Sequence, residues 1–107
     1  MTDKPTLISD AFRALIENAP KHQVAWAEAV QKLSAANAMD PKTSALAYLA
    51  VLAVAGLHSG IPFHVQGAKK AGASREEVIS AILIGLPAAG NRVIQALPAA
   101  IDAFDME

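Results

Sequence analysis

Apolar residues recur at helical spacing along most of the chain. The first predicted helix covers residues 7–18, and Ala19-Pro20 ends it because the residue before a proline disfavours helical backbone angles. A second helix is predicted over Lys21–Ala36, followed by a loop at residues 37–39. Its apolar stripe comprises Trp26, Val30 and Leu33. We expect these side chains to lie in a core or an interface.

The third predicted helix begins at Asp40-Pro41 and runs to about Ala55. Aspartate accepts hydrogen bonds from free amides at a helix start, and proline suits the first helical position. Gly56 is expected to end this helix. Its apolar residues point in every direction, which is typical of a helix that is buried on all sides.

Capping signals divide the remaining chain. A linker, Leu57–Ile61, leads to a predicted helix over Pro62–Ala71, and Ser74 with Glu77 forms a capping box that opens the next helix. Gly85-Leu86-Pro87 stops or kinks that helix. In the last helix Pro98 predicts a kink or a restart. No stretch has the alternation of a strand, so the predicted fold is all-α with five or six helices.

Composition adds an expectation about assembly. At 107 residues the chain is expected to form one domain, residues 1–107. Hydrophobic residues make up 53% of it but aromatic residues only 5%, so the core must consist of Ala, Leu, Ile and Val. A mean hydropathy of +0.31 is high for a small soluble monomer. We therefore expect the chain to bury apolar surface against copies of itself.

Charge and cysteine content exclude several classes of function. The formal net charge of −1 argues against electrostatic binding of nucleic acid, and Lys69, Lys70 and Arg75 are interpreted as a solvated helix end. The absence of cysteine excludes disulfides, thiol redox chemistry and zinc–thiolate sites. The continuous apolar run, Ala45–Leu57, is shorter than the roughly 20 residues that span a bilayer. The N-terminus also lacks a signal-peptide pattern, so a cytoplasmic location without membrane contact is expected.

The segment Gly56–Gly72 reads GLHSGIPFHVQGAKKAG and holds two of the three histidines and four of the six glycines. With its surroundings, DPKTSALAYLAVLAVAGLHSGIPFHVQGAKKAGASREEVISAIL at residues 40–83, it resembles the carboxymuconolactone decarboxylase and AhpD-like alkylhydroperoxidase superfamily. The shared features are a helix opening with Lys-Thr, a glycine, a motif ending in His and a Glu-Glu-Val helix. The resemblance implies an AhpD-like helical domain that forms a homotrimer or homohexamer, with pockets at subunit interfaces.

The resemblance also locates the family's active-site positions. Where the peroxidase branch has a glutamate and two cysteines, this chain has Ala45, Leu57 and Gly60, and His64 alone is retained. Thiol peroxidase chemistry is therefore not expected. The decarboxylase branch often has acidic residues four or five positions before the histidine, where this chain has Gly60 and Ser59.

Two histidines are the candidate catalytic residues. A neutral imidazole takes or gives a proton near pH 7, so His64 is the predicted acid/base; the alternative is a partly buried histidine bonded to a helix carbonyl. His58 would replace the missing acid, or it is an exposed loop residue. Their spacing of six residues does not suit a metal site, and no metal or cofactor is predicted.

Four residues are candidates for substrate binding. Ser59 would donate a hydrogen bond to a carboxylate or simply make a turn. Tyr48 would direct its hydroxyl at the pocket or lie in the core. Phe63 would lie in a core or an interface, or line the pocket beside His64. Arg92 would clamp a carboxylate or cap and pair at an interface.

Two functions remain open. The first is a cofactor-free lyase of the carboxymuconolactone decarboxylase type that uses histidine acid/base chemistry on a small carboxylic acid or lactone. The second is a non-catalytic oligomeric scaffold that binds a small ligand or a partner protein. Retention of His64 favours the first, and loss of the glutamate and both cysteine positions favours the second.

Overall fold

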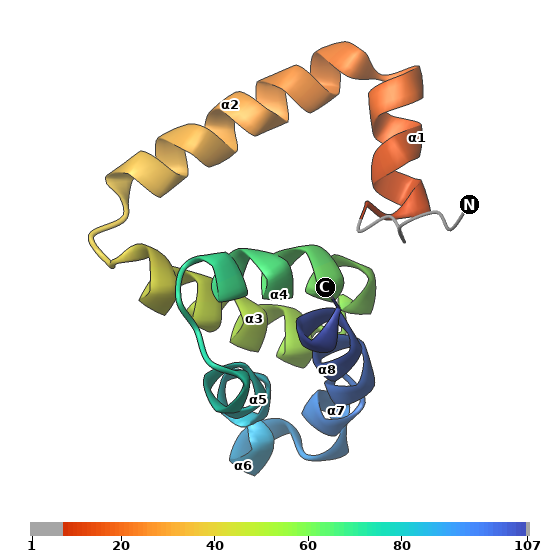
Figure 1. Ribbon diagram of the computed structural model, residues 1–107. Coiled ribbons are helices and arrows are strands. Elements are labelled where there is room, and N and C mark those ends of the chain that lie inside the picture. Colours follow the sequence, from red (N-terminus) through yellow and green to blue (C-terminus); the bar gives the residue numbers. More distant parts are fainter. Residues whose placement is uncertain (1–7, 107) are drawn as a thin grey trace. The chain divides into compact units, whose positions relative to one another are not determined.

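The computed structural model describes residues 8–106, which divide between Met39 and Asp40 into two compact units. Within the described residues all regular structure is helical, which confirms the all-α prediction. Six helices have nine or more residues, and the other helical segments are single turns (Figure 1). None of the helices in residues 8–106 is long and apolar enough to cross a membrane.

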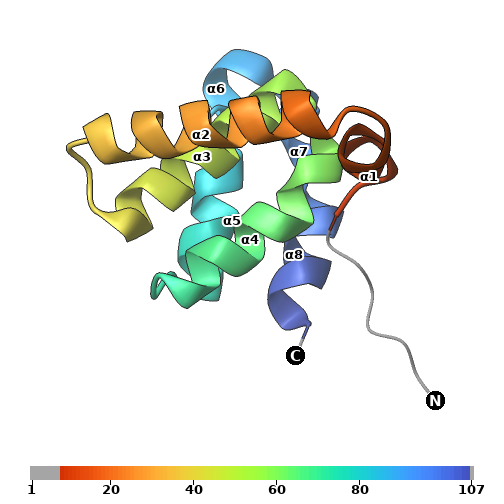
Figure 2. The same cartoon turned by 90° about the horizontal axis from the view of Figure 1, so that it is seen from above.

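The first unit is a pair of helices, α1 at Asp10–Asn18 and α2 at Pro20–Ala36. The side chain of Ser9 caps α1 by accepting a hydrogen bond from the amide of Phe12, so α1 begins later than predicted. In both Figure 1 and Figure 2, α1 turns away from the axis of α2. The ring centroids of Phe12 and Trp26 are 6.4 Å apart, yet the side chain of Trp26 is 57% exposed. Neither helix of this unit buries a residue, so the unit gives Trp26 no core of its own, and the expected interface stays a prediction.

The second unit contains the remaining helices, drawn in yellow-green to blue in Figure 1. They are α3 (Pro41–Ala55), a 3-10 turn (His58–Gly60), α4 (Ile61–Lys70), α5 (Arg75–Leu83), α6 (Leu86–Ala89), α7 (Asn91–Ile94) and α8 (Leu97–Asp105). Helix α4 packs against α3 and α8, and α5 packs against the same two helices. The core therefore lies among these four helices and α7, which contributes the buried Val93.

Local signals set the ends of these helices as predicted. Asp40 accepts a hydrogen bond from the amide of Thr43 at the start of α3, and Gly56 ends that helix with a φ of 73°. Ser74 and Glu77 form the capping box of α5. In the last predicted helix the chain breaks between α7 and α8, and Pro98 occupies the first turn of α8. It restarts a helix rather than kinking one.

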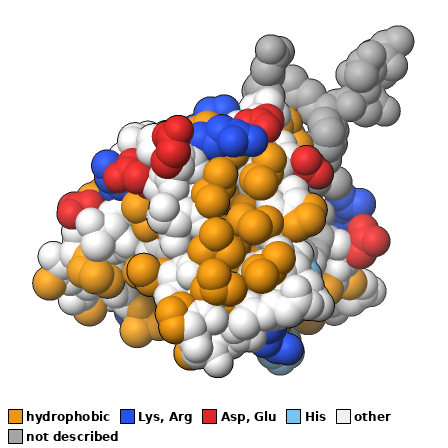
Figure 3. Space-filling view, turned by 90° about the horizontal axis from the view of Figure 1, so that it is seen from below, with side chains coloured by type: hydrophobic (Ala, Val, Ile, Leu, Met, Phe, Trp, Pro, Cys, Tyr) orange, Lys and Arg blue, Asp and Glu red, His pale blue; other side chains and the backbone are white. Residues whose placement is uncertain are grey.

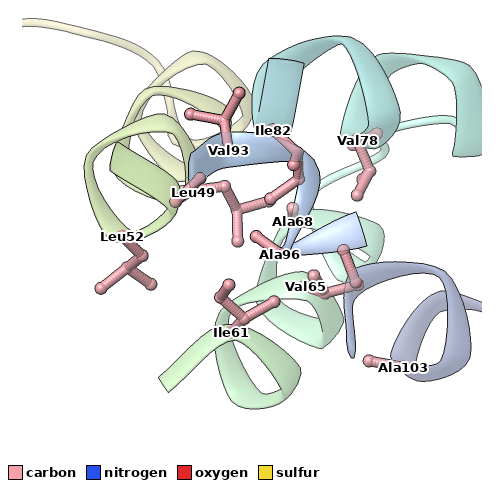
Figure 4. Close-up of a cluster of buried hydrophobic side chains, with 13 residues drawn as sticks. Leu49, Leu52, Ile61, Val65, Ala68, Val78, Ile82, Val93, Ala96 and Ala103 are labelled. Atoms are coloured by element: carbon pink, nitrogen blue, oxygen red, sulfur yellow. The ribbon is translucent and has the colours of Figure 1, made fainter. Parts of the chain in front are cut away.

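The core consists of aliphatic side chains and alanines (Figure 4), as the composition predicts. Its largest fully buried members are Leu49, Ile61, Ile82, Val65, Val78 and Val93. At Gly85 an added Cβ would lie 2.7 Å from a methyl group of Val54, so glycine is needed for close approach to α3.

The structure bears on two sequence interpretations. Within this unit the other helices cover only one side of α3: Leu49 is fully buried, whereas Val51 on the opposite side is 59% exposed, so burial of α3 on all sides against copies of the chain stays a prediction. The basic cluster is not a simple solvated end. Lys69 donates to the carbonyl of Phe104, and Arg75 pairs with Asp105, so both hold α8 in place.

Candidate functional site

The turn between α3 and α4 and the start of α4 carry the two candidate histidines. Its path begins at Gly56, whose left-handed conformation lets the amide of Leu57 donate to the carbonyl of Leu52, five residues earlier. The predicted linker is more ordered than expected, because His58–Gly60 forms a 3-10 turn and α4 begins at Ile61. This chain path places His58 in the turn and His64 in the first turns of α4.

The structure brings three of the predicted site residues together in an aromatic cluster, defined as Tyr48, Phe63 and His64. The ring centroids of Tyr48 and His64 are 4.5 Å apart, with the planes tilted by 53°. The ring of Phe63 contacts the same imidazole edge-on, with the ring centroids 5.2 Å apart. Tyr48 comes from α3 and the other two from α4, so the packing of these helices positions the cluster.

Burial controls the charge of His64. The imidazole is half-buried, and this desolvation lowers the pKa of His64 below its ordinary value of 6.5. Gly60 lies next to it, since a Cβ there would be 4.0 Å from His64 Cδ2. At pH 7 the imidazole is therefore predominantly neutral, with a nitrogen lone pair able to accept a proton.

His58 is only partly exposed, in contrast to the alternative of a loop histidine in bulk water. Its Nε2 atom is buried and has no hydrogen-bond partner within the described residues. An unpaired buried ring nitrogen costs free energy, so it marks a position where a ligand or a water molecule would be stabilised. Ser59, in the same turn, is exposed.

Arg92 lies at the C-terminal end of α3. Its guanidinium donates hydrogen bonds to the carbonyls of Val54 and Ala55, the latter at 2.9 Å. These are carbonyls that a helix leaves without internal partners, so Arg92 caps α3, which was the alternative considered for this residue. Seven residues separate Tyr48 from Ala55, or about 10 Å along the helix. The structure therefore does not bring the guanidinium into the aromatic cluster.

A second feature is a groove of about 510 Å³ between α3 and α5. Its floor is mainly apolar, from Leu46, Ala47, Ala50, Ala81 and Ile84, and the ion pair between Lys42 and Glu77 lies at one end. Figure 3 shows hydrophobic side chains gathered in a band on one face of the molecule, with charged residues beside it. Neither candidate histidine lines the groove. The sequence prediction missed this groove, although the small side chains of Ala47 and Ala50 on one side of α3 were a signal for it.

The arrangement offers proton-transfer chemistry more clearly than metal chemistry. Across residues 8–106, no three His, Asp or Glu side chains converge in a way that would hold a metal ion. A neutral imidazole flanked by two aromatic rings is suited to taking a proton from a bound molecule. The aromatic rings offer a flat apolar surface for that molecule.

Comparison with known proteins gives one match. The model of the carboxymuconolactone decarboxylase family matches residues 20–102, which include α2 through most of α8. No curated protein and no solved structure shows significant similarity to the chain. The match covers well over half of the sequence and confirms the family resemblance of the central segment, while the cysteine pair of the peroxidase branch is missing. The chain belongs to the carboxymuconolactone decarboxylase family, as a member without cysteine.

Proposed function

We propose that this protein is an enzyme that uses His64 as an acid/base on a small carboxylic acid or lactone, in the manner of a lyase of its family. The observation that carries the proposal is the half-buried imidazole, whose pKa burial lowers and which two aromatic rings flank. Family membership supports the general class, because it places His64 within the matched region.

The chemistry follows from the state of the imidazole. Abstraction of a proton from a carbon next to a carbonyl needs a base that is neutral at the working pH, and a positioned general base typically contributes a factor of about 10²–10⁴ in rate. The exposed parts of Tyr48 and Phe63 would hold the flat part of the substrate beside the ring. Histidine acid/base chemistry of this kind requires no cofactor.

His58 is the proposed second proton-transfer group. Its turn leads directly through Gly60 to α4, and its Nε2 atom is unpaired. A substrate oxygen or a bridging water would pair with that nitrogen. In this role His58 replaces the acidic residues that the decarboxylase branch carries near this position.

We propose further that the site is completed by self-association, as a trimer or hexamer. In one chain the aromatic cluster is open to solvent, with Tyr48 48% and Phe63 55% exposed. Large apolar side chains elsewhere on α3 and the turn, namely Val51, Val54 and Leu57, are 42–59% exposed. Covering these side chains with a second copy would remove apolar surface from water and close the pocket around His64.

A non-catalytic role is the alternative, and one observation favours it. Arg92, the candidate clamp for a substrate carboxylate, is used to cap α3. In this alternative the chain is an oligomeric scaffold, and its apolar groove between α3 and α5 binds a small ligand or a partner.

The test is turnover of a panel of small lactones and carboxylic acids by the intact protein, with His64→Gln as the variant. Loss of the base is expected to lower kcat by about 100-fold or more. In the wild type, kcat/KM is expected to fall on the acid side of a pKa below 6.5, because protonation removes the lone pair. The exposed His22, changed to Gln, is the matched control and should leave turnover unchanged.

Two outcomes of this experiment would contradict the proposal. One is a His64→Gln variant that retains full turnover of a substrate. The other is a panel in which no compound is converted while small ligands still bind, which would support the scaffold alternative.

A further inference from the structure

The surroundings of His64 indicate which substrates the site would accept. Tyr48 and Phe63 contact the imidazole from α3 and from α4, and each is about half exposed. Their exposed parts are therefore available to a ligand that lies beside the imidazole. Aromatic rings favour flat, apolar partners, which stack on them or meet them edge-to-face.

The hydrogen bonds of the Arg92 guanidinium are made within the folded chain. It donates to two backbone carbonyls of α3, and Gly56 leaves room for it: an added Cβ there would lie 2.8 Å from Arg92 Nη2. Recruiting this side chain to a substrate carboxylate would leave the end of α3 uncapped. Because the guanidinium packs closely against Gly56, we infer that Arg92 caps α3 and does not bind a ligand.

Other cations of the second unit are also engaged with the protein. Lys42 pairs with Glu77 at 2.9 Å, and Arg75 pairs with Asp105 at the same distance. Lys69 donates to the carbonyl of Phe104 and lies 4.8 Å from the centre of its ring. These contacts direct the three cations toward α5 and α8 rather than toward the aromatic cluster.

Lys70 is the remaining cation of the helix that carries His64. It lies six residues further along α4, which is about 9 Å along the axis and about 240° around it. That rotation turns Lys70 away from the side of α4 on which His64 lies. Among the described residues of the second unit, a carboxylate placed beside His64 would thus lose water without gaining a cationic partner, which disfavours its binding.

We infer that the aromatic cluster selects an uncharged, flat, unsaturated lactone over a carboxylate. This inference rests on the proposed function of His64 and narrows its substrate class. It also changes the reaction from decarboxylation to a proton shift. The imidazole takes the proton from the carbon next to the lactone carbonyl, and the electron pair of that C–H bond forms the enolate. The imidazolium then returns the proton to the γ carbon, so the double bond moves and nothing else is consumed.

Binding is tested first, with a pair of ligands that differ in charge. Methyl 2-furoate and 2-furoate share one flat ring and carry an uncharged ester or a carboxylate. NMR titration of the intact protein should show that the ester shifts the ring signals of His64 and Tyr48 and binds at least tenfold more tightly. Tyr48→Leu and Phe63→Leu should each weaken ester binding. Lys70→Gln is the charge control and should leave the preference unchanged.

The proton shift is tested separately with α-angelica lactone in D₂O. Exchange of deuterium into the γ carbon of the isomerised lactone, and its loss in His64→Gln, is the expected result. The two measurements separate the two claims. If the lactone exchanges but 2-furoate binds as tightly as its ester, the substrate class is wrong while catalysis by His64 stands. If the ester binds preferentially and no exchange occurs, the catalytic role of His64 is wrong. If neither furoate shifts the NMR ring signals of His64 and Tyr48, the inference itself is wrong.

Discussion

The contact between Gly56 and Arg92 gives a quantitative prediction about stability. Gly56 has a φ of 73°, a conformation that costs an L-residue roughly 1–2 kcal/mol. Alanine recovers about 0.4–1 kcal/mol of that cost through the lower entropy of the unfolded chain. Its methyl group would also lie 2.8 Å from Arg92 Nη2 and 3.2 Å from Arg92 Cζ, so the guanidinium would have to move. Gly56→Ala is therefore expected to destabilise the fold in two ways, through the backbone and through the cap.

Removal of the cap alone sets the scale for the second effect. Arg92→Met keeps much of the aliphatic stem but removes both hydrogen bonds to the end of α3. Each charged hydrogen bond is typically worth about 1.5–3 kcal/mol, but Arg92 is exposed, so we expect a combined loss of only about 1–2 kcal/mol. In the Arg92→Met background, Gly56→Ala no longer displaces a cap. The double variant should therefore be more stable than the sum of the single effects predicts, by about 0.5–1 kcal/mol.

Urea unfolding followed by circular dichroism measures these free energies for the wild type, both single variants and the double variant. Chain concentration must be held constant, since any self-association makes apparent stability depend on it. An unchanged m-value would show that the same surface unfolds in all four proteins. If the two substitutions add within about 0.3 kcal/mol, the guanidinium does not compete for the space at Gly56 and the reasoning is refuted.

Two further predictions concern the core and the assembly. Leu49→Ala removes a fully buried side chain and should lower the free energy of unfolding by about 2–5 kcal/mol in urea; a loss below 1 kcal/mol would show that α3 is not packed as described. Light scattering at micromolar concentration should give a mass above that of a monomer, and Val51→Asp on the exposed side of α3 should shift it toward the monomer, whereas a stable wild-type monomer would exclude the proposed assembly.

Arg92 illustrates what the sequence left open about the site. A lone arginine in an apolar region is compatible with a carboxylate clamp and with a helix cap. The choice depends on where the carbonyl of Val54 lies, 38 residues earlier in the chain. The same limit applies to Lys69 and Arg75, whose partners lie 30 or more residues away on α8. Short-range sequence patterns carry no information about such pairs.

The exposed sides of α3 and α2 show what hydropathy alone leaves open. A helix that is apolar on all sides predicts burial on all sides, and the helices of the second unit cover only the side of α3 that holds Leu49. Trp26 on α2 is similarly exposed in its own unit. Hydropathy indicates how much apolar surface a protein must bury. It does not indicate whether that surface is buried within one chain or against another copy.

The sequence by itself determined the all-α fold and those helix ends that nearby residues set. Asp40, Gly56 and the Ser74–Glu77 box act on amides and carbonyls within a few residues of themselves, so their effects are visible in a short stretch of sequence. Only the tertiary structure decided the chemistry of the site. Helix packing placed Tyr48 of α3 against His64 of α4 and left the imidazole half-buried, which lowers its pKa. It also placed the guanidinium of Arg92 at the end of α3, where it donates hydrogen bonds to backbone carbonyls. Those properties depend on the packing of separate helices, which sets solvent exposure and contact between residues that are distant in the chain.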